Sequence, residues 1–279
     1  MPSSRNYAVL IGVEHALDRA LTGPTHASAD VRAFKGVLEK LGYLRKDLFV
    51  LAGRGCTRSS IEARFRTLFD RVQQQSGNLI VYFGGPCFSI DGTNFLALTD
   101  SSTDDLEGTC IELNRLIQEI RRNPFLQIQV YLDFGPSAHP SPEVDGVPEI
   151  SAPSEDSIQK SIEGASNLVL FRACRANEVS YSSPSLKHGI WAQHILEAFS
   201  GKAPEVLAEG RFLLASRLQA FLGERVPRTL RDTYTDRRKR QTPWSGGNLR
   251  DDVKLADLAP ILTRTKSSFG ALGAAVKDF

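Results

Sequence analysis

Two short apolar runs with abrupt ends dominate the hydrophobic pattern of the chain. Residues 78–85 read NLIVYFGG, and residues 129–137 read QVYLDFGPS. Both runs are rich in β-branched and aromatic residues and stop at Gly or Pro, which is typical of buried parallel strands that end in loops. Because sites in open α/β sheets lie beyond the carboxyl ends of the strands, these two ends are expected to border the functional site.

Strand and helix patterns alternate along the rest of the chain. Apolar runs predict further strands at 7–13, 47–51 and 167–173, and helical spacing predicts helices over 29–42, 57–72, 109–120, 190–199 and 213–222. The order strand, helix, strand, helix, strand implies right-handed parallel crossovers. The predicted fold is a single three-layer α/β/α sandwich with a mostly parallel six-stranded sheet and helices on both faces.

Composition narrows the class of protein. With 279 residues, 41% hydrophobic and 24% charged, the chain is expected to be a soluble globular protein with a sizeable core. The net charge of +2 is too small to indicate a nucleic-acid or membrane partner, and no apolar run is long enough for a membrane span. The apolar run at 7–13 suits a first strand better than a signal peptide, so a cytoplasmic location is expected.

Cysteines and basic residues suggest no further chemistry. The spacing of Cys56, Cys87, Cys110 and Cys174 matches no zinc pattern, so reduced thiols, no metal and no cofactor are expected. The run RRKR at 237–240 could indicate nucleic-acid binding, but four charges beside a turn are more often a solvated surface.

Ordered motifs along the chain resemble the caspase-like peptidase family, which includes caspases, metacaspases and their bacterial relatives. They are YAVLIGV at 7–13, ADVRAF at 29–34, CRANEVSY at 174–181, HGIWAQHILEAFSGKA at 188–203 and QTPWSGGNL at 241–249. The resemblance implies a caspase-like domain over 5–255 and a C-terminal tail over 256–279. In that family the strand that corresponds to 78–85 usually ends YFSGHG, and the strand that corresponds to 129–137 usually ends LDACHSG. The His is the general base and the Cys is the nucleophile.

Both catalytic positions are substituted in this chain. The strands read YFGGPC and LDFGPS, so Pro86 stands where the His belongs and Gly135 where the Cys belongs. Proline cannot accept a proton, and glycine has no side chain to attack with. The resemblance therefore implies an inactive pseudo-protease that acts as a regulatory, scaffold, decoy or substrate partner of an active protease in a signalling or defence pathway.

The alternative function is an active cysteine endopeptidase with displaced catalytic residues. Cys87 lies one residue past the lost His position, and His139 lies four past the lost Cys position. A productive pair needs hydrogen-bond reach and an oxyanion hole aimed at the same carbon. Cys174 is a further thiol, for which a buried structural role is the better interpretation.

Binding could survive the loss of catalysis. Asp133 matches an Asp that helps arginine-specific relatives hold a basic side chain, and Glu178 falls in the segment that lines the same pocket. Two carboxylates there would suit a basic peptide, although Asp133 could instead be a hydrogen-bonded acid at a strand end. Family members pair through the last strand of the sheet, so self-association or pairing with an active relative is expected.

The segment 136–160 differs from the rest of the chain. It is rich in Pro, Ser and acidic residues, which predicts a mobile loop. It falls where family members carry the segment between their large and small parts, often cut on activation. An ordinary solvated insertion is the other interpretation.

Overall fold

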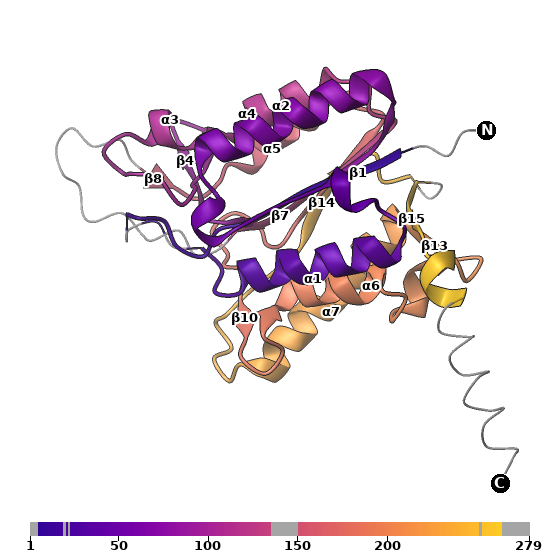
Figure 1. Cartoon of the computed structure of the whole chain (residues 1–279). Helices are drawn as coiled ribbons and strands as arrows, with labels where there is room; N and C mark the ends of the chain where they lie inside the picture. Colours follow the sequence, from indigo (N-terminus) through magenta and orange to yellow (C-terminus); the bar gives the residue numbers. More distant parts are fainter. Residues whose placement is uncertain (1–4, 19–20, 22, 135–149, 251–252, 264–279) are drawn as a thin grey trace, which may run out of the picture.

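A six-stranded sheet forms the centre of the molecule (Figure 1). The computed structural model describes residues 5–18, 21, 23–134, 150–250 and 253–263. Across the sheet the strands follow the order β14 (Trp244–Gly247), β9 (Leu168–Arg172), β7 (Gln127–Phe134), β3 (Gly77–Gly85), β1 (Arg5–Gly12) and β2 (Leu48–Ala52). All neighbours are parallel except β14, which runs antiparallel to β9. The predicted mostly parallel six-stranded sheet is confirmed.

Helices cover both faces of this sheet. Figure 1 shows α1 (Ala27–Lys40), α6 (Ile190–Phe199) and α7 (Ala215–Thr233) on one face, and α2 (Arg58–Gln74), α4 (Leu113–Arg121) and α5 (Glu155–Ile162) on the other. Alternate residues of a strand pack into the cores on opposite faces of the sheet. In β1, Ala8 and Leu10 pack on the face covered by α1, α6 and α7, and Val9 packs on the face covered by α2, α4 and α5. Burial on both faces explains why the strands are continuous apolar runs.

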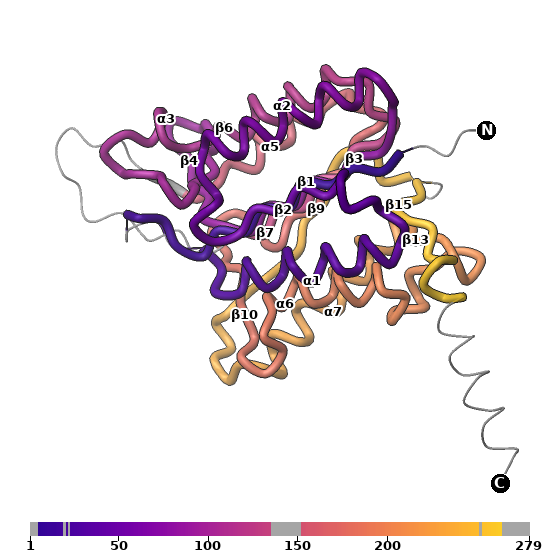
Figure 2. Tube along the Cα trace, viewed as in Figure 1, coloured from indigo at the N-terminus to yellow at the C-terminus, as the bar shows by residue number. Residues whose placement is uncertain are grey.

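Small antiparallel sheets lie outside the six-stranded sheet, and Figure 2 shows the path of the chain through them. One combines β4 (Cys87–Ile90), β5 (Thr93–Leu96), β6 (Ile111–Glu112) and β8 (Ile150–Ser151), beside the short helix α3 (Leu106–Thr109). A second combines β12 (Leu207–Ala208), β13 (Phe212–Leu214) and β15 (Lys254–Asp257), and a third pairs β10 (Ser182–Ser183) with β11 (His188–Gly189). The last pair lies beside α1 and α6 and helps to form the site described below.

Two predicted helices have different ends in the structure, and the one predicted to start at Leu213 starts at Ala215, because Leu213 and Leu214 belong to β13. The helix expected over 109–120 begins only at Leu113, because Ile111 and Glu112 pair with β5 instead. The helix expected over 213–222 continues to Thr233, because the buried residues Val226 and Leu230 extend its apolar stripe. Strand pairing therefore sets the start of α4, and the longer row of buried apolar residues sets the end of α7.

The segment boundaries near 136–160 and 256–279 also need correction. Residues 136–149 lie outside the described residues, but 155–160 belong to α5 and are not loop. Ser154 caps this helix by accepting a hydrogen bond from the backbone N–H of Ser157 at 3.2 Å. The segment assigned to the tail begins inside β15, and Leu258 beyond it is fully buried. In the part of the chain that the structure describes, no helix is long and apolar enough to span a membrane.

Candidate functional site

The carboxyl ends of β3 and β7 lie next to each other, as their sequences predict. The two strands pair in parallel, with Gly84 opposite Asp133 and Gly85 opposite Phe134. Pro86 follows β3 directly and is buried, and its carbonyl accepts a hydrogen bond from Ala97 at 3.0 Å. Gly135 and His139 lie outside the described residues.

Cys87 faces the core. It opens β4, pairs with Leu96 of β5 and is fully buried among the apolar residues under α2 and α4. Burial raises the pKa of its thiol far above the ordinary value, so the reactive thiolate is suppressed. Burial and a raised pKa argue against Cys87 as a displaced nucleophile.

The other cysteines are also inert in their surroundings. Burial raises the pKa of Cys174 to about 12, and its thiol donates to the Glu178 carbonyl at 3.4 Å. None of the four cysteines forms a disulfide. Among the described residues, no group of three or more His, Cys, Asp or Glu side chains could hold a metal ion.

A buried carboxyl pair is the main chemical feature of this edge. Asp133, near the end of β7, is fully buried, and its Oδ2 accepts a hydrogen bond from the Tyr82 hydroxyl at 3.2 Å. Burial and, to a smaller extent, the neighbouring Asp30 carboxylate of α1 raise the pKa of Asp133 to about 7. Hydrogen bonds from the Ser180 and Tyr82 hydroxyls stabilise the carboxylate and lower its pKa, which offsets part of this rise.

Asp30 is held against Asp133 by β11. The His188 Nδ1 lies 2.6 Å from Asp30 Oδ1, and the Gly189 N–H donates to Oδ2 at 3.2 Å. Burial raises the pKa of Asp30, and these two bonds oppose the rise. A Cβ at Gly189 would lie 3.2 Å from Asp133 Oδ2 and 3.3 Å from Asp30 Oδ2, so both carboxylates converge on the backbone at Gly189.

Comparison with known proteins agrees with this architecture. The family model "Caspase domain" matches residues 5–254. The chain is a member of the caspase family. No curated protein matches it.

Among solved structures, caspase-1 from Spodoptera frugiperda has a TM-score of 0.59 at 13% identity, covering 91% of this chain and 89% of that one. The Drosophila initiator caspase Dronc has a TM-score of 0.52 at 10% identity, covering 90% and 81%. At identities this low, the comparison shows that the fold is shared. It does not show that an activity is shared.

The acidic partner of Asp133 in this caspase fold is Asp30, which the sequence interpretation missed. The signal was present: Asp30 lies on the same helical stripe as the buried Val31 and Phe34, where an apolar residue is the norm. His188 and Gly189 lie more than 150 positions away from Asp30 in the chain. Only folding brings them together.

Glu178, the residue expected to share the pocket, is engaged elsewhere. Its carboxylate accepts hydrogen bonds from the Thr242 N–H at 2.6 Å and the Thr242 hydroxyl at 2.9 Å, and from the Arg175 N–H at 3.3 Å. These bonds fasten the loop after β9 to the segment before β14. Glu178 therefore positions the loop, and Asp30 is the carboxylate that accompanies Asp133.

Replacing Glu178 with alanine is expected to destabilise the caspase domain by about 2 kcal/mol, because hydrogen bonds to a charged acceptor are lost. Chemical denaturation measures the change in the free energy of unfolding. Glu163→Ala, at an exposed carboxylate, is the control and should change stability by less than about 0.5 kcal/mol. Equal effects of the two substitutions would contradict the role assigned to Glu178.

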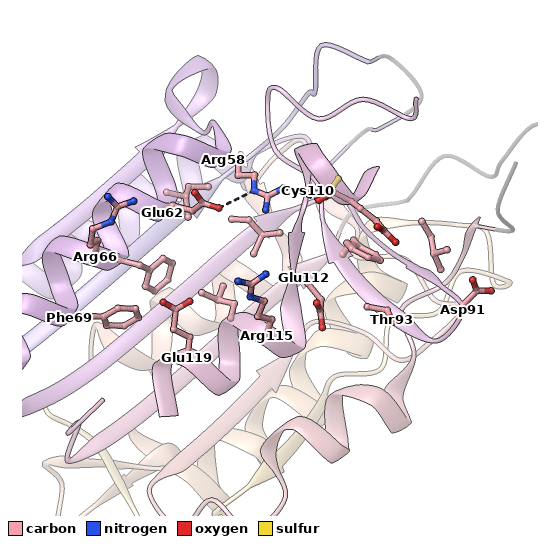
Figure 3. Close-up of a pocket in the computed structure, with 17 residues that line it drawn as sticks. Arg58, Glu62, Arg66, Phe69, Asp91, Thr93, Cys110, Glu112, Arg115 and Glu119 are labelled. Atoms are coloured by element: carbon pink, nitrogen blue, oxygen red, sulfur yellow. Dashed lines mark hydrogen bonds and ion pairs between the residues drawn. The ribbon is translucent and has the colours of Figure 1, made fainter. Parts of the chain in front are cut away.

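A separate cavity of about 670 Å³ lies between α2, α4 and the β4–β5 hairpin of the caspase fold (Figure 3). Charges of both signs surround it, including an Arg58–Glu62 ion pair of 2.9 Å. Cys110, which lines it, is buried, and burial raises the pKa of its thiol, which donates a hydrogen bond to the Ser101 hydroxyl. None of Pro86, Asp133 and Glu178 lines this cavity, so it is not the site predicted from the sequence.

Proposed function

We propose that this caspase-family chain is a catalytically inactive pseudo-protease that binds a basic segment of a protein partner. The support for the proposal is that Pro86 stands at the position which the sequence resemblance gives to the general base and that the neighbouring Cys87 is buried, whereas the acidic pair Asp30–Asp133 lies at the same edge. Catalytic groups are missing while groups that attract a cation remain.

A cationic side chain suits this pair for a physical reason. Two buried carboxyl groups that lie close together disfavour double ionisation, and a guanidinium or ammonium between them removes that penalty. The Asp133 Oδ1 has no hydrogen-bond partner in the described part of the chain, so it has capacity to accept one. The ligand class is therefore a peptide with an Arg or Lys side chain.

The partner is proposed to be an active caspase-like protease or a second copy of this chain. In the described structure β14 is the last strand of the sheet and pairs on one side only, with β9. An open strand edge is a surface on which another strand can add. Through it the protein would serve as a regulator, scaffold, decoy or substrate in a signalling or defence pathway inside the cytoplasm.

The test is a peptidase assay combined with a binding titration. The purified chain is incubated with Arg-ended and Asp-ended fluorogenic peptides, with and without calcium, and with an uncleaved basic peptide. We expect no turnover, and saturable binding of the basic peptide that Asp133→Ala weakens. Sustained turnover that a thiol alkylator abolishes would overturn the proposal, and the Cys87→Ala variant would then identify or exclude Cys87 as its source.

A further inference from the structure

The cavity between α2, α4 and the β4–β5 hairpin has an apolar floor. Part of this floor belongs to side chains buried in the protein, and part stays half-exposed, namely Phe69, Ile90 and Ile111. The rings of Phe65 and Phe69 lie 5.8 Å apart between centroids. A volume of about 670 Å³ is in the range of sites that bury a ligand, so the floor offers room for apolar side chains from outside.

The walls of this cavity carry more acidic than basic groups. Five carboxylates and three guanidinium groups line it. The Arg58 guanidinium is engaged, because it pairs with Glu62 at 2.9 Å and donates to the Glu107 carbonyl at 2.8 Å. Figure 3 shows Glu112, Arg115 and Glu119 on the α4 side of the cavity. A segment that covers the floor and carries basic side chains at its margin matches these walls.

The segment 264–279, which lies outside the described residues, has a sequence of this kind. Its large apolar residues follow the spacing of one face of a helix: Phe269, Leu272, Val276 and Phe279. On the same helix Lys266 and Lys277 would lie beside this apolar stripe. The segment contains three basic residues and one acidic residue, so its charge is opposite to that of the cavity walls.

The lengths of the segment and the cavity also agree. Helix α2 lines the cavity from Arg58 to Phe69, which is about 16.5 Å along the helix axis. A helix from Phe269 to Phe279 would span about 15 Å. The apolar stripe of the segment can therefore contact the floor over its whole length.

The occupant is expected to come from a second copy of the chain. Leu258 and Leu262, just before the segment, pack against the core under α1, α6 and α7, whereas Phe65 and Leu116 of the floor belong to the core on the opposite face of the sheet. From Thr263 to Phe269 the chain spans at most about 20 Å. The route to the cavity of the same copy passes the sheet and two helix layers, each about 10 Å thick, so that copy's own segment is too short.

We propose that the cavity between α2 and α4 binds segment 264–279 of a second copy of this chain as an amphipathic helix. The apolar stripe packs on the floor, and Lys266 and Lys277 meet the carboxylates of Glu112 and Glu119. The contact joins two different surfaces, so reciprocal exchange of segments closes a dimer. The cavity is separate from the β14 edge and from the acidic pair of the proposed function, and the inference does not depend on either.

Sedimentation equilibrium of the full chain at increasing concentration tests the proposal. We expect self-association with a dissociation constant on the order of 10 μM, since the glycines of the segment disfavour a helix before it docks. Leu272→Asp places a charge on the apolar stripe and should weaken self-association at least tenfold. Ala274→Asp is the matched control, because it adds the same charge on the opposite side of the same helix, and it should have little effect.

A second pair of variants tests the location of the contact. Glu119→Lys reverses an exposed charge in the cavity wall and should weaken self-association about fivefold. Glu163→Lys makes the same change at an exposed residue that does not line the cavity, and it should leave the dissociation constant unchanged. An excess of a synthetic peptide with the sequence 264–279 should return the full chain to monomers.

Each other result overturns the inference. A chain that stays monomeric at every concentration shows that the segment does not dock on a second copy. Equal dissociation constants for Leu272→Asp and Ala274→Asp show that the apolar stripe is not used, and equal constants for Glu119→Lys and Glu163→Lys show that the segment docks elsewhere. Self-association that persists at full strength in Leu272→Asp arises at another surface, such as the β14 edge, and leaves the pairing in the proposed function standing.

Discussion

Replacing Asp133 with asparagine is expected to remove a large part of the pH dependence of stability between about pH 4 and pH 7. The pKa of Asp133 is raised from 3.8 to about 7 in the folded chain, mainly by burial. Between these values the folded state keeps a proton that the unfolded state has released. Stability from this group is therefore fully present below the lower value and is lost as the pH rises through the upper one.

The expected size is large for a single side chain. A shift from 3.8 to about 7 corresponds to roughly 4 kcal/mol as an upper bound. Asparagine cannot ionise, so the variant should lose less stability than the unaltered chain between pH 4 and pH 8. At pH 8 it should be the more stable of the two, because it carries no buried charge.

Guanidinium denaturation at pH 4, 6 and 8 measures these free energies of unfolding. Asp104→Asn, at an exposed carboxylate, serves as the control and should follow the unaltered chain at every pH. If Asp133→Asn loses as much stability between pH 4 and pH 8 as the unaltered chain does, Asp133 does not titrate in this pH range and the prediction is wrong.

Replacing Trp191 with alanine is expected to cost about 3 to 5 kcal/mol of stability. Trp191, on α6, is fully buried and packs its ring 6.2 Å from that of Tyr82 and 6.3 Å from that of Tyr131. Removing it leaves a cavity under Tyr82, whose hydroxyl holds Asp133. The loss should therefore appear both in stability and in binding of the basic peptide.

Trp191→Phe is the matched control for that substitution. It keeps most of the ring contacts and removes an indole N–H that has no hydrogen-bond partner in the described structure. Its loss of stability, from thermal or chemical unfolding, should be clearly smaller. Equal losses in both variants would mean that packing around Trp191 does not depend on the volume of its side chain.

Much of the fold could be predicted from the sequence because each strand is buried on both faces. β1, β3 and β7 are continuous apolar runs that end in glycine or loops, and their order along the chain requires parallel crossovers. Helix ends were less predictable. The start of α4 depends on the pairing of Ile111 with β5, a contact that no local pattern encodes.

The site could be predicted only in part. The position of Asp133 at a strand end follows from the local pattern, whereas the choice of its partner does not. Glu178 is closer to Asp133 in the chain than Asp30 is, yet Glu178 bonds to Thr242, and α1 carries Asp30 into the pocket. A carboxylate is satisfied by whichever donors the fold brings to it.

The sequence by itself determined the alternation of strands and helices and the identity of the side chains at positions 86 and 135, because burial patterns and side-chain chemistry are properties of each residue in its local context. Only the tertiary structure decided that Cys87 is buried and that Asp30 meets Asp133. Access, pKa and hydrogen bonding depend on groups that lie far apart in the chain and meet only when the sheet assembles.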